Sequence, residues 1–273
     1  MEKIHFISGL PRSGSTLLAA LLRQNPRFTA GMSGPLAGLF GALLNEMSAR
    51  NEFSIFIDDA KRERILHGLF DSYYADSPAE VVFDTNRAWC AWMPAIVRLF
   101  PDAKVIACVR DVSWVVDSIE KIVQGNVFSP SSIFNYTTGG TVYTRANAVV
   151  APDGMVGVAY DALKQACYGP QRDRLLLVQY ESLTADPAKT MHAIHEFLEE
   201  PQFEYDFEHT DYDVTDFDER ANSSAGTPGL HTVRSSVNFE PRETVLPPEL
   251  FARFANDAFW RDPERAPLGL RVV

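Results

Sequence analysis

A loop near the N-terminus constrains the fold of this chain more than any other feature. Gly9 to Thr16 has the spacing G-x-x-x-x-G-S-T and lies between the apolar run Lys3–Ile7 and the Leu- and Ala-rich run Leu17–Leu22. A strand, a loop with two glycines and a helix N-terminus together direct backbone N–H groups at one place, where an anion binds. The sequence therefore predicts an α/β fold that begins with a phosphate-binding loop.

Three further apolar segments have the length of buried strands: Glu80–Asp84, Ala103–Arg110 and Arg174–Tyr180. Because they alternate with helical segments, they indicate a parallel sheet with helices on both faces. We therefore expect a three-layer α/β fold of the P-loop nucleotide-binding type. We expect one domain over residues 1–273, with substrate-facing insertions near 127–152 and 200–228. The expected helices are Pro35–Ser48, Asp59–Tyr74, Trp92–Phe100, Trp114–Gln124, Val156–Tyr168, Pro187–Leu198 and Pro248–Phe259.

The loop differs from that of a nucleoside triphosphatase at one position. Ser15 stands where such a loop carries the lysine that reaches the β- and γ-phosphates, which argues against ATP or GTP chemistry. Arg12, inside the loop, instead offers a planar fork of donors to a phosphate or sulfate oxygen. A kinase using ATP and Mg²⁺ stays an alternative, because Val81 to Asp84 has the pattern of a Walker B strand with Asp84 available to the metal.

The stretch Pro11-Arg12-Ser13-Gly14-Ser15-Thr16 resembles the first loop, P-[KR]-S-G-[ST]-[ST], of the sulfotransferases that use 3′-phosphoadenosine 5′-phosphosulfate (PAPS). The residues of this loop are most similar to those of the protein-tyrosine and bacterial branches of that family. The resemblance implies that these six residues hold the 5′-phosphosulfate and that Arg12 stabilises charge on the leaving phosphate. Arg110 and Ser118, eight residues apart, match the family's second signature, which implies binding of the 3′-phosphate. A structural ion pair of Arg110 with Asp111 or Asp117 is the alternative.

Two weaker matches complete the implied cofactor site. Tyr180, in a V-x-Y-E-x-L segment, is implied to lie near the adenine, with a core-edge aromatic as the alternative. By rough alignment, Arg242 falls where tyrosine-sulfating members of that family carry a basic residue on the phosphosulfate, although it is equally well explained as a plain surface arginine. The resemblance implies PAPS as donor and adenosine 3′,5′-bisphosphate (PAP) as product. We expect no metal, because the transferred sulfuryl group carries less charge than a phosphoryl group.

The general base is where the chain departs from the family. Tyrosine-sulfating members carry a glutamate in a G-E-E stretch, whereas Ala30–Pro35 here contains no acid. The histidine of cytosolic members is replaced near Asn86. Asp84 and His231 remain as candidate bases. Asp84 is equally well explained as a strand-end carboxylate paired with Arg12 or Arg87, and His231 as a loop residue with a structural hydrogen bond. Arg87 is a candidate second cation near the sulfate, and we leave the role of Arg234 open.

Composition limits the partners and the compartment. A net charge of −11 disfavours nucleic acid and anionic membranes, which need a positive surface. The three cysteines form no C-x-x-C pair, so we expect neither a disulfide nor a zinc site, and a reducing, cytoplasmic setting. We see no signal sequence and no apolar run long enough to span a membrane.

We expect the acceptor to be a hydroxyl of a small molecule rather than of a protein. A non-catalytic nucleotide-binding relative is the alternative to an enzyme. The oligomeric state is open.

Overall fold

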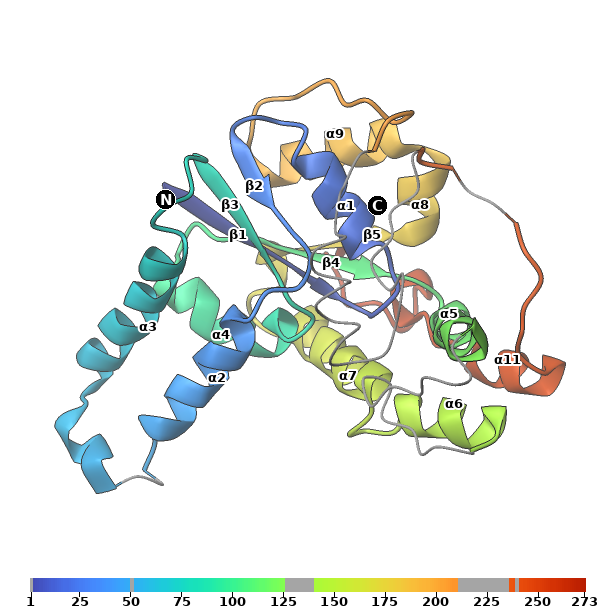
Figure 1. The fold of residues 1–273 in the computed structure, drawn as a ribbon, viewed down its shortest axis with the longest axis horizontal. Coiled ribbons are helices and arrows are strands. Elements are labelled where there is room, and N and C mark those ends of the chain that lie inside the picture. The colour runs from blue at the N-terminus through green and yellow to red at the C-terminus, as the bar shows by residue number, and fades with distance from the viewer. Residues whose placement is uncertain (1, 50–51, 126–139, 211–235, 239–240) are drawn as a thin grey trace.

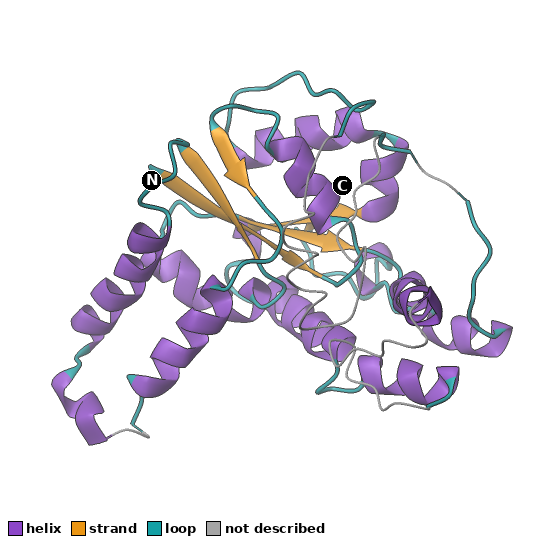
Figure 2. Ribbon diagram, in the orientation of Figure 1, coloured by secondary structure: helices purple, strands orange, loops and turns teal. Residues whose placement is uncertain are grey.

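The centre of the protein is a sheet of six parallel strands in the order β2-β3-β1-β4-β5-β6. The computed structural model describes residues 2–49, 52–125, 140–210, 236–238 and 241–273. The strands are β1 (Lys3–Gly9), β2 (Phe28–Ala30), β3 (Val81–Thr85), β4 (Val105–Val109), β5 (Leu175–Gln179) and β6 (Arg271–Val272). This arrangement confirms the predicted α/β fold with a parallel sheet (Figure 2).

Helices cover both faces of the sheet (Figure 1). One face carries α1 (Ser15–Leu22), α8 (Tyr180–Ala185) and α9 (Pro187–Leu198). The other carries α2 (Leu36–Glu46), α3 (Asp59–Tyr73), α4 (Trp89–Leu99), α5 (Val112–Gly125), α6 (Val142–Val150), α7 (Met155–Tyr168) and α11 (Pro248–Phe254). Short 3₁₀ turns lie at η1 (Glu52–Phe56), η3 (Arg172–Arg174) and η4 (Phe259–Arg261). None of the described helices combines the length and apolar character that crossing a membrane requires.

The strands form where they do because alternate side chains enter two different cores. Phe6 of β1 packs with the helices on one face, whereas the next residue, Ile7, packs with those on the other. Every residue of β3 and β4 is buried, as the continuous apolar runs predicted. The two strands flank β1 in register, with Ile7 paired to both Thr85 and Ile106. The loops that follow β1, β3 and β4 therefore leave the sheet at one edge.

Several element boundaries differ from the sequence prediction. The strands β2 and β6 were not predicted, because two or three residues show no recognisable periodicity. The helix expected over Pro248–Phe259 ends at Phe254 and is followed later by a 3₁₀ turn. Tyr180, which we placed at the end of a strand, is the first residue of α8 instead. Part of the expected insertion near 127–152 is the helix α6.

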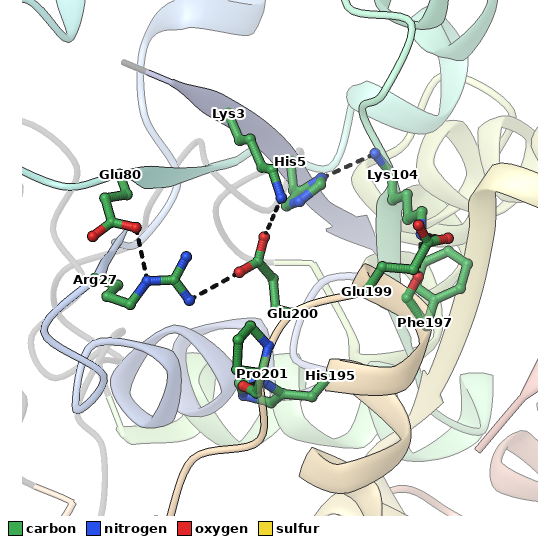
Figure 3. A network of polar contacts seen from close by, with 10 residues as sticks. All are labelled: Lys3, His5, Arg27, Glu80, Lys104, His195, Phe197, Glu199, Glu200 and Pro201. Atoms are coloured by element: carbon green, nitrogen blue, oxygen red, sulfur yellow. Dashed lines mark hydrogen bonds and ion pairs between the residues drawn. The ribbon is translucent and has the colours of Figure 1, made fainter.

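Polar side chains join the amino-terminal edge of the sheet to the end of α9 (Figure 3). The Glu200 side chain is buried and accepts from Lys3 Nζ at 2.7 Å and from Arg27 Nη1 at 3.1 Å. Buried His5 accepts the backbone N–H of Lys104 on Nδ1 at 3.2 Å, and no described residue hydrogen-bonds its Nε2. Burial lowers the pKa of His5 to about 4. This edge lies opposite the loops that carry the predicted site, so we interpret the network as structural.

Candidate active site

The first loop requires glycine where β1 ends. Gly9 has a φ of 105°, in the region that residues with side chains rarely adopt. A Cβ at this position would lie 2.1 Å from the carbonyl oxygen of Cys108 on the neighbouring strand β4. The absence of a side chain thus lets the loop turn directly over the end of the sheet.

The rest of the loop curls toward the start of α1. Arg12 and Gly14 both have positive φ values, 59° and 91°, so the backbone is left-handed at two positions within a few residues. Gly14 precedes the helix and brings no side chain to cap its first turn, which leaves backbone N–H groups facing the loop. Ser13 is buried and its hydroxyl donates to the carbonyl oxygen of Pro11 at 3.4 Å. The loop has the form of an anion cradle, as its spacing predicted.

A hydrogen bond joins the two predicted anion-binding elements. Arg12 Nε donates to Ser118 Oγ at 3.2 Å, although the two residues are 106 positions apart. Ser118 lies on α5, which follows the end of β4, so the structure brings the loop cation to the second signature. Arg12 and Ser118 therefore belong to one site rather than two.

Arg110 is half-buried and directly follows the carboxyl end of β4. Its guanidinium carbon lies 4.1 Å from the centre of the Tyr180 ring and 5.9 Å from that of Trp114. Its Nε is buried and makes no hydrogen bond within the described ranges, and burial lowers the pKa of the guanidinium. The predicted alternative, a structural ion pair with Asp111 or Asp117, is not found there. A half-buried guanidinium whose buried Nε has an unused donor is suited to an anionic ligand.

Tyr180 connects Arg110 to the loop. A Cβ on Gly14 would lie 3.1 Å from Cδ2 of the Tyr180 ring, so glycine permits the close packing of loop and ring. With Arg110 stacked on it, the ring holds that cation beside the loop. From the sequence we expect Tyr180 to lie near the adenine. The structure adds that its ring lies between two predicted phosphate-binding elements, the loop and Arg110.

Arg242 joins the site from the C-terminal part of the chain. Its guanidinium carbon lies 4.9 Å from the centre of the Trp114 ring and it forms an ion pair with Asp117. Trp114 also faces Arg110, so Arg242 lies on the Arg110 side of the site. Our sequence reasoning missed Trp114 and the contacts of Asp117. The sequence did offer one signal for Asp117: a charged residue on the apolar face of α5 is expected to have a buried polar partner.

Asp84 lies at the end of β3 in an enclosed setting. Its Oδ2 accepts from the Tyr74 hydroxyl at 2.6 Å and its Oδ1 from Trp89 Nε1 at 2.7 Å. Burial raises the pKa of the Asp84 carboxyl, against the two hydrogen bonds, which lower it. A Cβ on Gly34 would lie 3.7 Å from Oδ2, so a residue without a side chain covers this carboxylate. Arg87 is exposed and forms no ion pair with Asp84.

Two of the candidate residues lie outside the described part of the chain. His231, the second candidate base, and Arg234 both fall in residues 211–235. The structure therefore does not test either role.

This chain is similar in sequence to known proteins. The sequence profile of the sulfotransferase family matches residues 5–205. Among characterised relatives, protein-tyrosine sulfotransferase 2 of Gallus gallus is 24% identical over 200 residues, which cover 71% of this chain and 50% of that protein. Protein-tyrosine sulfotransferase of Drosophila melanogaster is 22% identical over 203 residues, covering 72% and 38% respectively. This chain thus spans about half the length, or less, of these two relatives.

Solved structures show the same fold. The sulfotransferase domain from the curacin biosynthetic pathway superimposes with a TM-score of 0.58 at 15% identity, over 93% of this chain and 96% of that one. Mouse sulfotransferase SULT7A1 complexed with PAP gives a TM-score of 0.52 at 15% identity, over 97% and 86%. Because the family profile matches more than half of its residues, this chain belongs to the sulfotransferase family.

Proposed function

We propose that this protein transfers a sulfuryl group from PAPS to the hydroxyl of an acceptor. The observation that carries the proposal is the convergence of the loop cation Arg12, the hydroxyl of Ser118 and Arg110 with its unsatisfied, buried Nε. Family membership supports the transfer, and the PAP bound to mouse SULT7A1 supports an adenosine bisphosphate as the product.

The residues present fit such a donor at both of its charged ends. The loop residues Pro11–Thr16 would hold the 5′-phosphosulfate through backbone N–H groups and Arg12. Arg110 and Ser118 would hold the 3′-phosphate, which gives the unused donor of Arg110 an acceptor. The ring of Tyr180 packs between the loop and Arg110, which places it to support the bound nucleotide.

When bound, PAPS supplies the sulfuryl group and a phosphate as the leaving group. The acceptor oxygen forms a bond to sulfur, the bond from sulfur to the phosphate oxygen breaks, and the hydroxyl proton passes to a base. Arg12 neutralises the charge that builds on the leaving oxygen. Its link to Ser118 fixes the guanidinium before reaction, so little reorganisation is needed during the transfer.

Asp84 is our first candidate for the base. Its raised pKa makes its carboxylate a stronger proton acceptor than an exposed aspartate, and Tyr74 and Trp89 hold it in one orientation. Asp84 is buried, and Gly34, which has no side chain, lies next to its Oδ2, so we propose that the acceptor approaches from the side of Gly34. His231 remains the second candidate.

We keep two acceptor classes in the proposal. A small-molecule hydroxyl follows from our sequence interpretation. A tyrosine side chain of a protein is favoured by the names of the two relatives, both protein-tyrosine sulfotransferases. A cytoplasmic setting is a prediction that rests on the three buried, unpaired cysteines.

Nucleotide binding and transfer test the proposal in two steps. We expect PAP to raise the melting temperature more than ATP with Mg²⁺ does, and labelled PAPS to transfer its label to a hydroxyl in a panel of phenols, alcohols and tyrosine peptides. Arg12→Met should abolish transfer, whereas Arg172→Met, at an exposed arginine on η3 before β5, should not. Stronger stabilisation by ATP with Mg²⁺ would favour the kinase, and PAP binding without transfer to any acceptor would favour a non-catalytic relative.

A further inference from the structure

Asp117 is a buried carboxylate whose hydrogen bonds and ion pair, among the residues that the structure describes, come from one distant segment. It lies on α5, directly before Ser118, and its side chain is fully buried. Its Oδ1 accepts from the Thr244 hydroxyl and from the backbone N–H of Val245, both at 2.7 Å. Its Oδ2 forms the ion pair with Arg242. Asp117 therefore fastens the segment Arg242–Val245 to the helix that carries Ser118.

This attachment determines where the Arg242 guanidinium lies. It is held over the Trp114 ring, at 4.9 Å from the ring centre, and the Arg110 guanidinium lies 5.9 Å from the centre of the same ring. Two arginines that are 132 positions apart in the sequence thus share one aromatic side chain. Trp114, one turn before Asp117 on α5, supplies that shared surface.

We propose that Asp117 is a positioning residue that holds Arg242 beside Arg110, so that the two arginines together select nucleotides carrying a 3′-phosphate. The inference rests on the proposed function, because it assumes that Arg110 faces this phosphate. It assigns Arg242 to the 3′-phosphate end of the donor, rather than to the phosphosulfate as we expected from the sequence.

The charges around this pair fit a phosphate monoester. A terminal phosphate carries about −1.5 to −2 charges at neutral pH, which two guanidinium groups match better than one. Without a ligand, Arg110 and Arg242 repel each other, and the Asp117 carboxylate offsets that repulsion. Asp117 therefore lets two cations remain close together in the empty site.

Anchoring the segment Arg242–Val245 does not by itself explain the negative charge of Asp117. Its two hydrogen bonds from Thr244 and Val245 go to a single oxygen, and the side-chain oxygen of an asparagine would accept both. Burying a charge is costly, so a neutral residue would anchor the segment at lower cost. The charge is explained by the guanidinium of Arg242, which it holds in place.

A double-mutant cycle on nucleotide affinity tests this role. We would measure the affinities for PAP and for adenosine 5′-monophosphate (AMP), which lacks the 3′-phosphate, by calorimetry. The variants are Asp117→Asn, Arg242→Gln and the double variant, with Glu243→Gln as the matched control. Glu243 is the exposed neighbour of Arg242, so this control removes one negative charge from the same segment. Melting temperatures of all variants would verify folding.

We expect Asp117→Asn to weaken PAP binding about tenfold, because the change misplaces one charge-assisted contact, that of Arg242 with the 3′-phosphate. Binding of AMP should not change. The same change should have no further effect in the Arg242→Gln background, because Asp117 acts through Arg242. Glu243→Gln should bind both nucleotides as the wild type does.

Additive effects of the two changes, or an equal loss of PAP and AMP affinity in Asp117→Asn, would overturn the inference and leave the proposed function standing. A wild-type protein with no preference for PAP over AMP would instead refute the proposed function itself. The cycle therefore separates the two failures.

Discussion

Replacing Arg110 should weaken nucleotide binding and stabilise the ligand-free protein at the same time. Arg110 lies over the Tyr180 ring and near the Trp114 ring, with a buried Nε that no described residue satisfies, and burial lowers the pKa of its guanidinium. A methionine would keep most of the volume of the side-chain stem and remove the charge. The two expected effects have opposite signs because the cation is unfavourable in the empty site and favourable beside a phosphate.

The magnitudes follow from the contacts. An unsatisfied buried donor costs about 1–3 kcal/mol, and stacking on Tyr180 returns about 0.5–2 kcal/mol. Arg110→Met should therefore stabilise the ligand-free protein by roughly 1 kcal/mol, or about 2 °C in melting temperature. Losing two charge-assisted hydrogen bonds to a phosphate costs about 3 kcal/mol or more, which is about a 100-fold loss of PAP affinity.

Calorimetry and thermal denaturation measure the two effects on the same samples. AMP, which lacks the 3′-phosphate, should bind equally well before and after the change. Arg110→Lys, which keeps the charge but loses the planar fork, should lie between wild type and Arg110→Met in PAP affinity. The exposed Arg172→Met serves as the control for removal of one positive charge. Unchanged PAP affinity in Arg110→Met, or a melting temperature several degrees lower, would refute this reasoning.

Further predictions concern the loop, the buried histidine, the amino-terminal edge and the base. Gly9→Ala should yield little folded protein in expression and circular dichroism tests, because its Cβ would lie 2.1 Å from the Cys108 oxygen. The pKa of His5 is lowered from 6.5, its value in the unfolded chain, to about 4 in the folded protein. On acidification the unfolded chain therefore binds a proton at a higher pH than the folded protein does, and the free energy of unfolding falls as the pH drops below about 6.5. For this group we expect a loss of about 2 kcal/mol between pH 7 and pH 5 in urea titrations, which His5→Asn should largely remove. Glu200→Gln should lower the free energy of unfolding by about 1 kcal/mol, since it removes the buried charge between two cations; an unchanged value at neutral pH would contradict the ion pairing. Asp84→Asn should lower kcat about 100-fold or more with little change in PAP affinity, and an unaltered kcat would exclude Asp84 as the base.

Some of the site could be predicted because its signals are local. The spacing from Gly9 to Thr16 specifies a turn that glycine permits, and the structure places positive φ values within it. Arg110 and Ser118 lie at a strand end and on the helix that follows, so their spacing alone brings them to the same edge of the sheet.

Other features could not be predicted because their signals are distributed. The partners of Asp84 come from the end of α3 and the start of α4, and nothing in either segment marks them as neighbours. The short strands β2 and β6 are stabilised by pairing with longer strands rather than by their own sequence.

The sequence by itself determined the turn from Gly9 to Thr16, the parallel sheet and the family. Each depends on residues close together in the chain, where backbone sterics and burial on two faces leave few alternatives. Only the tertiary structure decided that Arg12 bonds Ser118, and that Asp117 brings Arg242 to the Trp114 ring beside Arg110. The physical reason is that parallel strands deliver distant segments to one edge of the sheet, whereas the packing that matches one segment to another leaves no periodic pattern in the sequence.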